Sequence, residues 1–233
     1  MRIVTWNCNG ALRNKLDVID TLKADLLVVQ ECENPSESSS KIYKNWAENY
    51  LWEGSYKSKG VGVFAKAPLV LERLNLDAGG LECFLPFKLN KMVSILAVWS
   101  KQNNSPTFAY IGQIWKYLQK HKHVFSNENS IILGDFNSNT CWDIWDRWWN
   151  HSDVVRELAE IGVCSIYHEQ YQEPHGQESQ STFYMYRKSD KPYHIDYVFL
   201  SQFLLKKSSL EIGDKNFWLQ HSDHIPLVVE LDI

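Results

Sequence analysis

Short apolar runs rich in β-branched residues recur along the whole chain, and they constrain its fold more than any other feature of the sequence. Runs of this length and composition, bounded by polar residues, are typical of β-strands. A chain with this many candidate strands is predicted to fold around β-sheets. The runs cover Arg2 to Trp6, Leu26 to Gln30, Val61 to Lys66, Val93 to Trp99, Ile131 to Leu133, Ile195 to Leu200 and Ile225 to Leu231.

Between some of these runs, apolar residues recur at every third or fourth position, which is the spacing of one helix face. Strands outnumber helices, and hairpin-length spacings occur beside longer connections that can hold a crossover helix. The pattern predicts an α/β or α+β domain with mixed sheets and helices outside them. The helical segments are Leu12-Leu16-Ile19-Leu22, Ile111-Ile114-Tyr117-Leu118 and Val154-Val155-Leu158-Ile161.

The composition is that of a globular protein. The chain has 233 residues, of which 44% are hydrophobic and 22% charged, enough for one domain over residues 1–233 with a sizeable core. It contains no internal repeat or long linker that would suggest a second domain, and we expect a monomer. A net charge of −4 provides no global attraction to nucleic acid, although a local basic groove is compatible with it.

The chain also lacks the patterns of export and anchoring. Its first residues are soon too polar for a signal peptide, and no apolar run approaches the roughly 18 residues of a membrane-spanning helix. The five cysteines are scattered without a Cys-x-x-Cys spacing, which argues against a disulfide framework or a cysteine zinc site. Reduced thiols and a cytoplasmic location are therefore expected.

Polar residues gather where the predicted strands end, which is where functional side chains usually lie. A single carboxylate in such a place is more often a turn residue or a helix cap than a catalytic group. Several of them in one chain are more informative. They are Asn7 and Asn9 after the first run, Glu31 after the second, Asp135 and Asn137 after Ile131-Ile132-Leu133-Gly134, Asp196 near the start of the sixth, and Asp223 and His224 before the last.

Taken in order, five fragments resemble the motifs of the endonuclease/exonuclease/phosphatase superfamily, which includes exonuclease III and deoxyribonuclease I. The resemblance extends from residue 3 to about residue 231. It implies a four-layer α/β/β/α sandwich, in which two mixed sheets pack face to face with helices outside. The fragments are Thr5-Trp6-Asn7-Cys8-Asn9-Gly10, Gln30-Glu31, Gly134-Asp135-Phe136-Asn137-Ser138, His194-Ile195-Asp196-Tyr197 and Ser222-Asp223-His224-Ile225-Pro226-Leu227.

The residue types suit a magnesium-dependent hydrolase, with Mn²⁺ as the alternative ion. Mg²⁺ prefers oxygen ligands, commonly one or two carboxylates and several waters. Glu31 is the predicted ligand, and Asn7 beside it offers an amide oxygen or orients the phosphate. Asn9 is a candidate to hold a metal-bound water, and Asp223 to contribute to a second metal position.

The remaining candidates suit the chemistry of the reaction. Asp135 is predicted to orient or deprotonate the attacking water, and Asn137 to donate its amide hydrogens to a phosphate oxygen. Asp196 and His224 are predicted to pair, which favours an imidazolium that can bind or protonate a phosphoryl oxygen. His194 is either a further substrate contact or a buried core histidine.

Two aromatic features leave the substrate open. Relatives place a tyrosine or histidine near Trp99, but an indole can donate one hydrogen bond and cannot act as an acid. Four tryptophans follow the Asp135 motif, and Trp142 and Trp145 among them could stack on nucleobases. Their spacing favours the other interpretation, the buried face of a helix. The cluster is Trp142, Trp145, Trp148 and Trp149.

The favoured function is a metal-dependent nuclease similar to exonuclease III, with nucleic acid as its partner. One alternative keeps the same chemistry on a phospholipid, an inositol phosphate or a nucleotide. A second alternative is a catalytically silent binding domain of the same fold. The complete set of acidic, amide and imidazole residues argues against this last hypothesis, because a silent domain has no chemical need for them.

Overall fold

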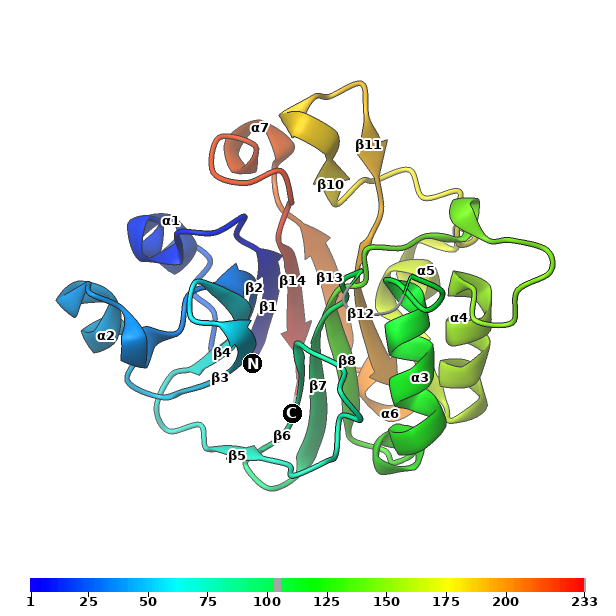
Figure 1. The fold of residues 1–233 in the computed structure, drawn as a ribbon, viewed down its shortest axis with the longest axis horizontal. Helices are drawn as coiled ribbons and strands as arrows, with labels where there is room; N and C mark the ends of the chain where they lie inside the picture. Colours follow the sequence, from blue (N-terminus) through cyan, green and yellow to red (C-terminus); the bar gives the residue numbers. More distant parts are fainter. Residues whose placement is uncertain (103–105, 233) are drawn as a thin grey trace.

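The computed structural model of the chain describes residues 1–102 and 106–232, and within them two mixed β-sheets pack face to face (Figure 1). The first sheet has six strands, and β1 runs parallel to β2 while all other neighbours are antiparallel. In spatial order these strands are β13 (Ser208–Ile212), β14 (Leu227–Leu231), β1 (Arg2–Asn7), β2 (Leu26–Cys32), β4 (Lys59–Ala65) and β3 (Tyr50–Tyr56).

The second sheet also has six strands, of which only β7 and β8 are parallel neighbours within the described residues. A two-stranded ribbon, β10 (Phe183–Tyr184) with β11 (Pro192–Tyr193), stands above one end of both sheets (Figure 1). The strands of the second sheet are, in spatial order, β5 (Leu71–Arg73), β6 (Phe84–Leu89), β7 (Val93–Trp99), β8 (Ser130–Asp135), β12 (Asp196–Ser201) and β9 (Val163–Ser165).

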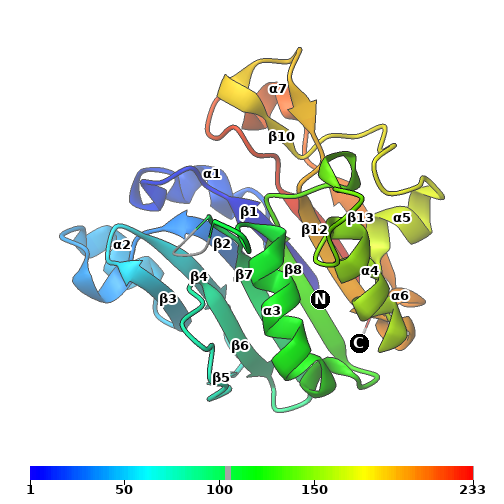
Figure 2. The ribbon, with the colours of Figure 1, turned by 45° about the vertical axis from the view of Figure 1, so that its right-hand side comes forward.

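Helices cover the outer faces of the two sheets. Figure 1 shows α1 and α2 beside the first sheet and α3 and α4 beside the second, and Figure 2 shows α3 lying along β7 and β8. The α-helices are α1 (Leu16–Asp20), α2 (Lys41–Trp46), α3 (Ile111–His121), α4 (His151–Glu160), α5 (Ile166–Tyr171), α6 (Gln202–Leu205) and α7 (Lys215–Trp218). The 3-10 helices are η1 (Leu12–Asn14), η2 (Pro35–Glu37), η3 (Lys122–Phe125), η4 (Thr140–Trp142) and η5 (Met185–Arg187).

The central strands are buried on both faces, which explains why their sequences are continuous apolar runs. In β8, Ile131 and Leu133 belong to the core between the sheets, whereas Ile132 packs with the helices α3 and α4. In β2, Val28 faces the core between the sheets and Val29 faces the side covered by α1 and α2. The four-layer sandwich expected from the family resemblance is therefore confirmed.

The sequence pattern located the central strands better than the edges. Every predicted strand overlaps an observed one, and the predicted helices over 111–118 and 154–161 coincide with α3 and α4. The single helix predicted from Leu12 to Leu22 is wrong, because the backbone leaves the helical region at Lys15 (φ −129°) and separates η1 from α1. Among the described helices, none combines the length and apolar character needed to cross a membrane.

A close backbone contact in β8 requires glycine at position 134. Gly134 has φ +137°, and a Cβ atom added there would lie 2.0 Å from the carbonyl oxygen of Val98 on β7. A side chain at this position would push β7 and β8 apart one residue before Asp135. The contact therefore fixes the sheet directly beneath the polar cluster at the strand ends.

We predict that Gly134→Ala lowers the free energy of unfolding by about 3 kcal/mol, because overpacking adds to the cost of the backbone conformation. Urea denaturation measures this change. Gly162→Ala is the matched control: Gly162 also has positive φ (+75°), but no described atom lies within 4 Å of the added Cβ. This variant should lose about 1 kcal/mol of unfolding free energy, which is the cost of placing alanine at positive φ without a steric clash. Equal losses in the two variants would contradict the packing argument.

Candidate active site

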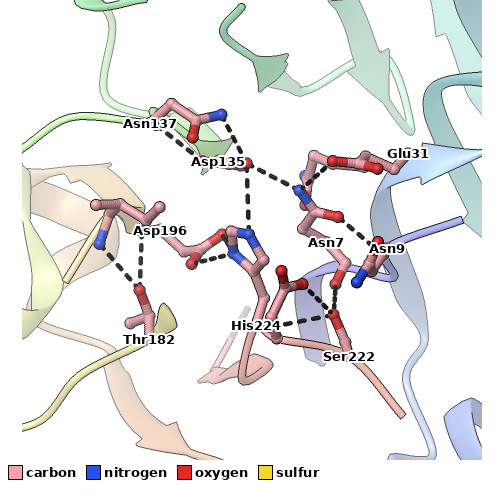
Figure 3. A network of polar contacts seen from close by, with 12 residues as sticks. Asn7, Asn9, Glu31, Asp135, Asn137, Thr182, Asp196, Ser222 and His224 are labelled. Carbon is pink, nitrogen blue, oxygen red and sulfur yellow. Dashed lines mark hydrogen bonds and ion pairs between the residues drawn. The ribbon is translucent and has the colours of Figure 1, made fainter. Parts of the chain in front are cut away.

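Polar side chains from both sheets meet where β1, β2 and β8 end and β12 begins (Figure 3). Asn7 is the last residue of β1 and Asp135 the last of β8. Asp196 opens β12, which runs antiparallel to β8, so that Asp196 is the register partner of Asp135. His224 comes from the loop that leads into β14. Residues more than 200 positions apart in the chain thus share one site.

A single amide joins the two sheets at this point. The Asn7 Nδ2 group donates to Asp135 Oδ2 at 2.9 Å and lies 3.3 Å from Glu31 Oε1. Ser222 fixes the same strand end from the other side, since its hydroxyl donates to the Asn7 carbonyl at 2.7 Å and accepts from the His224 N–H at 3.1 Å. Asn7 is therefore held by its backbone while its side chain bridges two carboxylates.

A β-bulge in β2 presents Glu31 to the site. The pairing of β2 with β4 shifts register between Gln30 and Cys32, and Glu31 between them has φ +60°. In a regular strand, side chains alternate between the two faces of the sheet. A bulge breaks this alternation, so the side chain of the extra residue takes a different direction. Gln30 remains in the buried interior, where its amide donates to Thr5 Oγ1 at 3.0 Å. The Glu31 carboxylate is partly exposed and forms an ion pair with Lys59 of β4.

The Asp135 carboxylate is fully buried and held by three donors. Asn137 donates its backbone N–H to Oδ1 at 2.8 Å and its side-chain amide to Oδ2 at 3.0 Å, and Asn7 supplies the third hydrogen bond. Burial raises the pKa of Asp135 to about 7, although the charge of His224 and these hydrogen bonds act in the opposite direction. A carboxyl group with a pKa near neutrality can both accept and return a proton.

His224 lies between two carboxylates. Its Nδ1–H donates to Asp196 Oδ2 at 2.8 Å, and its Nε2 lies 3.9 Å from Asp135 Oδ2. Burial alone would lower the pKa of His224, but Asp196 and Asp135 outweigh it and raise the pKa to about 9. The ring is therefore an imidazolium at neutral pH, and Trp6 Nε1 fixes its backbone by donating to the His224 carbonyl at 3.0 Å.

The sequence pattern missed several residues that support this site. The Thr182 hydroxyl accepts the backbone N–H groups of Ile195 and Asp196, both at 3.0 Å, and so fixes the start of β12. Lys59 pairs with Glu31, and the Ser100 carbonyl accepts the Asn137 amide at 3.0 Å. Thr182 lies in a polar loop without any strand pattern nearby, so no local signal marks it.

The oxygen donors around Glu31 fit a hard divalent cation. Lys59 places a positive charge against one oxygen of this carboxylate, where such a cation would also bind. The Asn7 amide oxygen accepts the Asn9 N–H at 3.0 Å, and Asn9 itself is exposed. The half-buried Asp223 lies on the His224 side, next to Ser222. Glu31, with Asn7 beside it, remains the predicted metal position.

A second group could also hold an ion by geometry alone. Asp135, Asp196 and His224 each offer one ligand atom, and these atoms lie within 4.8 Å of one another. All three residues are buried, and hydrogen bonds within the protein already engage the Asp196–His224 pair and both oxygens of Asp135. The accessible Glu31 carboxylate is the better position for an exchangeable ion.

An aromatic cavity of about 560 Å³ opens beside Asn137. Trp142 and Tyr193 line it with ring centroids 5.0 Å apart, and Phe183 lines it while packing against the His224 ring at 4.6 Å. Arg147 adds a cationic group to the same wall. The cavity therefore adjoins the candidate active site at Asn137 and has flat aromatic walls.

The prediction that the tryptophan cluster forms the buried face of a helix is wrong. The segment after Asn137 is a loop with one short 3-10 helix, and Trp142, Trp145 and Trp148 are 46%, 95% and 63% exposed. Trp149 alone packs inward, against Phe108 at 4.6 Å. Exposed indoles next to a cavity favour the alternative interpretation, contact with a substrate.

Two other candidate substrate contacts lie elsewhere. His194 is buried, and its Nδ1–H donates to the Gln180 carbonyl at 2.8 Å, away from the Asp135 network. It is thus a core histidine, the second of the two interpretations that its sequence position left open. Trp99 packs against the core between the sheets, with Lys101 Nζ 5.1 Å from its ring, and it does not line the cavity within the described residues.

Comparison with known proteins agrees with this geometry. A model of the endonuclease/exonuclease/phosphatase family matches residues 4–224. No curated protein sequence matches the chain significantly. The family model therefore detects a relationship that comparison with individual curated sequences does not.

Solved structures share the fold at low sequence identity. A 3′ phosphatase from Neisseria, bound to a product DNA hairpin, has 18% identity and a TM-score of 0.71. A 3′–5′ exonuclease from Neisseria meningitidis and an AP endonuclease from Archaeoglobus fulgidus each have 18% identity and a TM-score of 0.72. In all three comparisons the alignment covers 100% of both chains.

We predict that Asn7→Ala lowers the free energy of unfolding by about 1–3 kcal/mol, because it leaves the buried Asp135 carboxylate short of a donor. Chemical denaturation monitored by tryptophan fluorescence measures the change. Asn216→Ala in α7 is the control, since Asn216 is exposed and its side chain makes no hydrogen bond with the described residues. If both variants were as stable as the parent, Asn7 would not link the sheets energetically.

Proposed function

Because the chain belongs to the endonuclease/exonuclease/phosphatase family of phosphate ester hydrolases, we propose that it is a magnesium-dependent nuclease that cleaves phosphodiester bonds. The observation that carries the proposal is the meeting of Asn7, Glu31, Asp135 and the Asp196–His224 pair at one site beside an aromatic cavity. A nucleic acid supplies both chemical groups that such a site accommodates, an anionic phosphodiester and flat bases.

Glu31, with Asn7 beside it, would hold the metal ion, Mg²⁺ or alternatively Mn²⁺. A bound divalent cation supplies positive charge that stabilises the phosphoryl oxygens as negative charge develops on them. Lys59 must then give up its place at the Glu31 carboxylate. Asn9 and Asp223, at the exposed side of the site, remain candidates for holding a metal-bound water and a second ion.

The other steps of the reaction, proton transfer and phosphate binding, fall to side chains of the protein itself. Asp135 accepts a proton from the attacking water, for which its raised pKa is suited. The His224 imidazolium, oriented by Asp196, binds a phosphoryl oxygen. Asn137 donates its amide hydrogens to Asp135 and Ser100, so its first task is to position the base. Contact between Asn137 and a phosphate oxygen would require one of these bonds to exchange.

The rim of the site favours nucleic acid over a small ester. Trp142 lines the cavity, Trp145 and Trp148 are exposed in the same loop, and every nucleobase presents a face on which an indole can stack. Lys15 and Arg187 lie close enough to affect each other electrostatically, and Lys59 adds a third positive charge near Glu31. Basic side chains are therefore present near the site despite a net charge of −4, alongside the acidic Glu31, Glu33 and Asp223.

The solved relatives are consistent with this substrate class. The Neisseria phosphatase was solved with a DNA hairpin, and the other two relatives are described as an exonuclease and an AP endonuclease. Their identity to this chain is 18%, so they support the fold directly and the substrate only by analogy. The substrate itself must be decided by experiment.

We expect hydrolysis of short DNA and RNA to require Mg²⁺ or Mn²⁺ and to stop in the presence of a chelator. Glu31→Gln should raise the Mg²⁺ concentration at half-maximal rate by about 10-fold or more, because it removes a ligand charge. Asp135→Asn should lower turnover by about 100-fold without recovery at high Mg²⁺, because it removes the base. Initial rates across a Mg²⁺ titration separate the two effects.

Glu48→Gln is the control for this experiment, since Glu48 is exposed between α2 and β3 and makes no described contact with the site. Full activity in the chelator would overturn the metal-dependent mechanism. Hydrolysis of a small phosphodiester or a phospholipid, with no binding or cleavage of nucleic acid at low salt, would replace the nuclease by the corresponding phosphodiesterase. Inactivity on every ester would indicate a silent domain.

We also expect Trp145→Ala and Trp142→Ala to weaken binding of single-stranded DNA by about 5-fold or more each, from the roughly 1–3 kcal/mol that one stacked base contributes. Hydrolysis of a small phosphodiester such as bis(p-nitrophenyl) phosphate should change little, since neither residue contacts the Asp135 network. Phe203→Ala removes an exposed ring from α6 and should alter neither quantity. Fluorescence anisotropy measures DNA binding, and a colorimetric assay measures the rate of small-ester hydrolysis. Parallel losses of binding and of small-ester hydrolysis would argue against a stacking role.

A further inference from the structure

A second cluster of metal-ligating side chains lies behind the catalytic loop, separate from the Asp135 network. His168 of α5 and two residues of the following loop, His175 and Glu178, each offer a ligand atom, and these atoms lie within 4.8 Å of one another. The His168 Nε2 atom is 3.1 Å from Glu178 Oε1. Two ligands on a tetrahedral zinc ion lie about 3.3 Å apart, given bonds of about 2.0–2.1 Å.

The cluster is organised by outer contacts of the kind that orient metal ligands. The other ring nitrogen of His168, Nδ1, lies 2.7 Å from the Ser165 hydroxyl. Asn139 donates its amide to both oxygens of Glu178 at 3.1 Å, and the Gly176 N–H donates to Oε1 at 2.9 Å. Such partners set the tautomer and the direction of a ligating group. These contacts fix His168 and Glu178 against each other, and an ion bound between them would replace the direct contact between His168 Nε2 and Glu178 Oε1.

The surrounding histidines leave nitrogen atoms without partners in the interior. His151 is fully buried, its ring lies 5.5 Å from that of His175, and neither of its nitrogens has a hydrogen-bond partner among the described residues. The same holds for Nε2 of the buried His194, whose ring lies 6.0 Å from that of His168. The His175 Nδ1 atom is also without a described partner. Buried polar atoms are normally satisfied by protein, water or an ion.

The protonation states suit metal binding. Burial lowers the pKa of His175 to about 3 and also lowers the pKa of His151 and His194. Burial acts to raise the pKa of Glu178, but its hydrogen bonds, above all from His168, lower it to about 2. At neutral pH His175 is therefore a neutral imidazole and Glu178 a carboxylate, which are the forms that bind metals.

We propose that His168, His175 and Glu178 bind one divalent transition-metal ion of the zinc class. Two imidazoles and one carboxylate match the ligands that zinc takes, whereas Mg²⁺ prefers an all-oxygen environment. The ion would join His168 of α5 to Glu178 in the following loop and so stabilise this part of the fold. Asn139 extends the connection, because its Nδ2 donates to Glu178 and, at 3.0 Å, to the His194 carbonyl. Asn139 follows Asn137 by two residues, so the same ion would also anchor the loop that carries Asp135 and Asn137. Zinc binding by these three residues does not require the chain to be a nuclease.

The test uses the full chain, stripped with a chelator and then kept in excess Mg²⁺ so that the Glu31 position is occupied. Isothermal titration with Zn²⁺ and elemental analysis should find one tightly bound zinc ion per chain, and Zn²⁺ should raise the melting temperature. His175→Gln and Glu178→Gln should weaken zinc binding by about 100-fold or more. His123→Gln, which changes an exposed histidine, should bind zinc like the parent chain.

Three further variants keep the result unambiguous. His175→Cys keeps a zinc ligand at this position and should still bind zinc. Binding by this variant would show that His175→Gln loses zinc because it lacks a ligand, and not because position 175 tolerates no substitution. Glu31→Gln and Asp196→Asn should bind zinc normally, because they alter only the other site. Substitution with Co²⁺ should produce visible absorption bands of a tetrahedral ion that vanish in His175→Gln. The proposal is overturned if the parent chain binds no more zinc than His175→Gln, or if zinc binding is lost in Asp196→Asn and retained in His175→Gln.

Discussion

The hydrogen bond from the Asn7 amide to the Asp135 carboxylate is the contact on which the site depends. It joins the end of β1 in one sheet to the end of β8 in the other, across the 2.9 Å that separates Nδ2 from Oδ2. Gly134, one residue before Asp135, favours this approach, because a Cβ atom there would lie 3.0 Å from Gln30 Nε2 of the first sheet. Packing of the two sheets thus sets the relative positions of Asn7 and Asp135, two residues of the candidate active site.

The charged residues of the site differ in how deeply they are buried. Asp135, Asp196 and His224 are buried, and the charge of the imidazolium offsets part of the cost of burying the two carboxylates. Glu31 lies nearer the surface, where Lys59 balances its charge and a metal ion can exchange with it. This arrangement fits a reaction in which the proton-transfer groups stay fixed while metal and substrate come and go.

The loop after β8 connects the two candidate metal environments. Its first half carries Asp135 and Asn137, which belong to an oxygen-rich site suited to Mg²⁺. Its second half carries Asn139, which contacts Glu178 in a cluster rich in imidazole. Ligand chemistry alone would keep the two ions apart, because hard oxygens and histidine nitrogens select different metals. The second site would then act on the first through the position of one short loop.

The sequence by itself determined the central strands, the family and the residues at the strand ends, because two-sided burial leaves apolar runs that can be read locally and because Asn7, Glu31, Asp135 and His224 stand in recognisable motifs. Edge strands such as β13 were missed, since half-exposed strands lack a continuous apolar run. Only the tertiary structure decided that Trp142 lines a cavity and Trp145 is exposed, that Thr182 supports Asp196, and that His168, His175 and Glu178 meet. These features depend on loops whose shape is set by contacts between distant segments, and no local periodicity records such contacts.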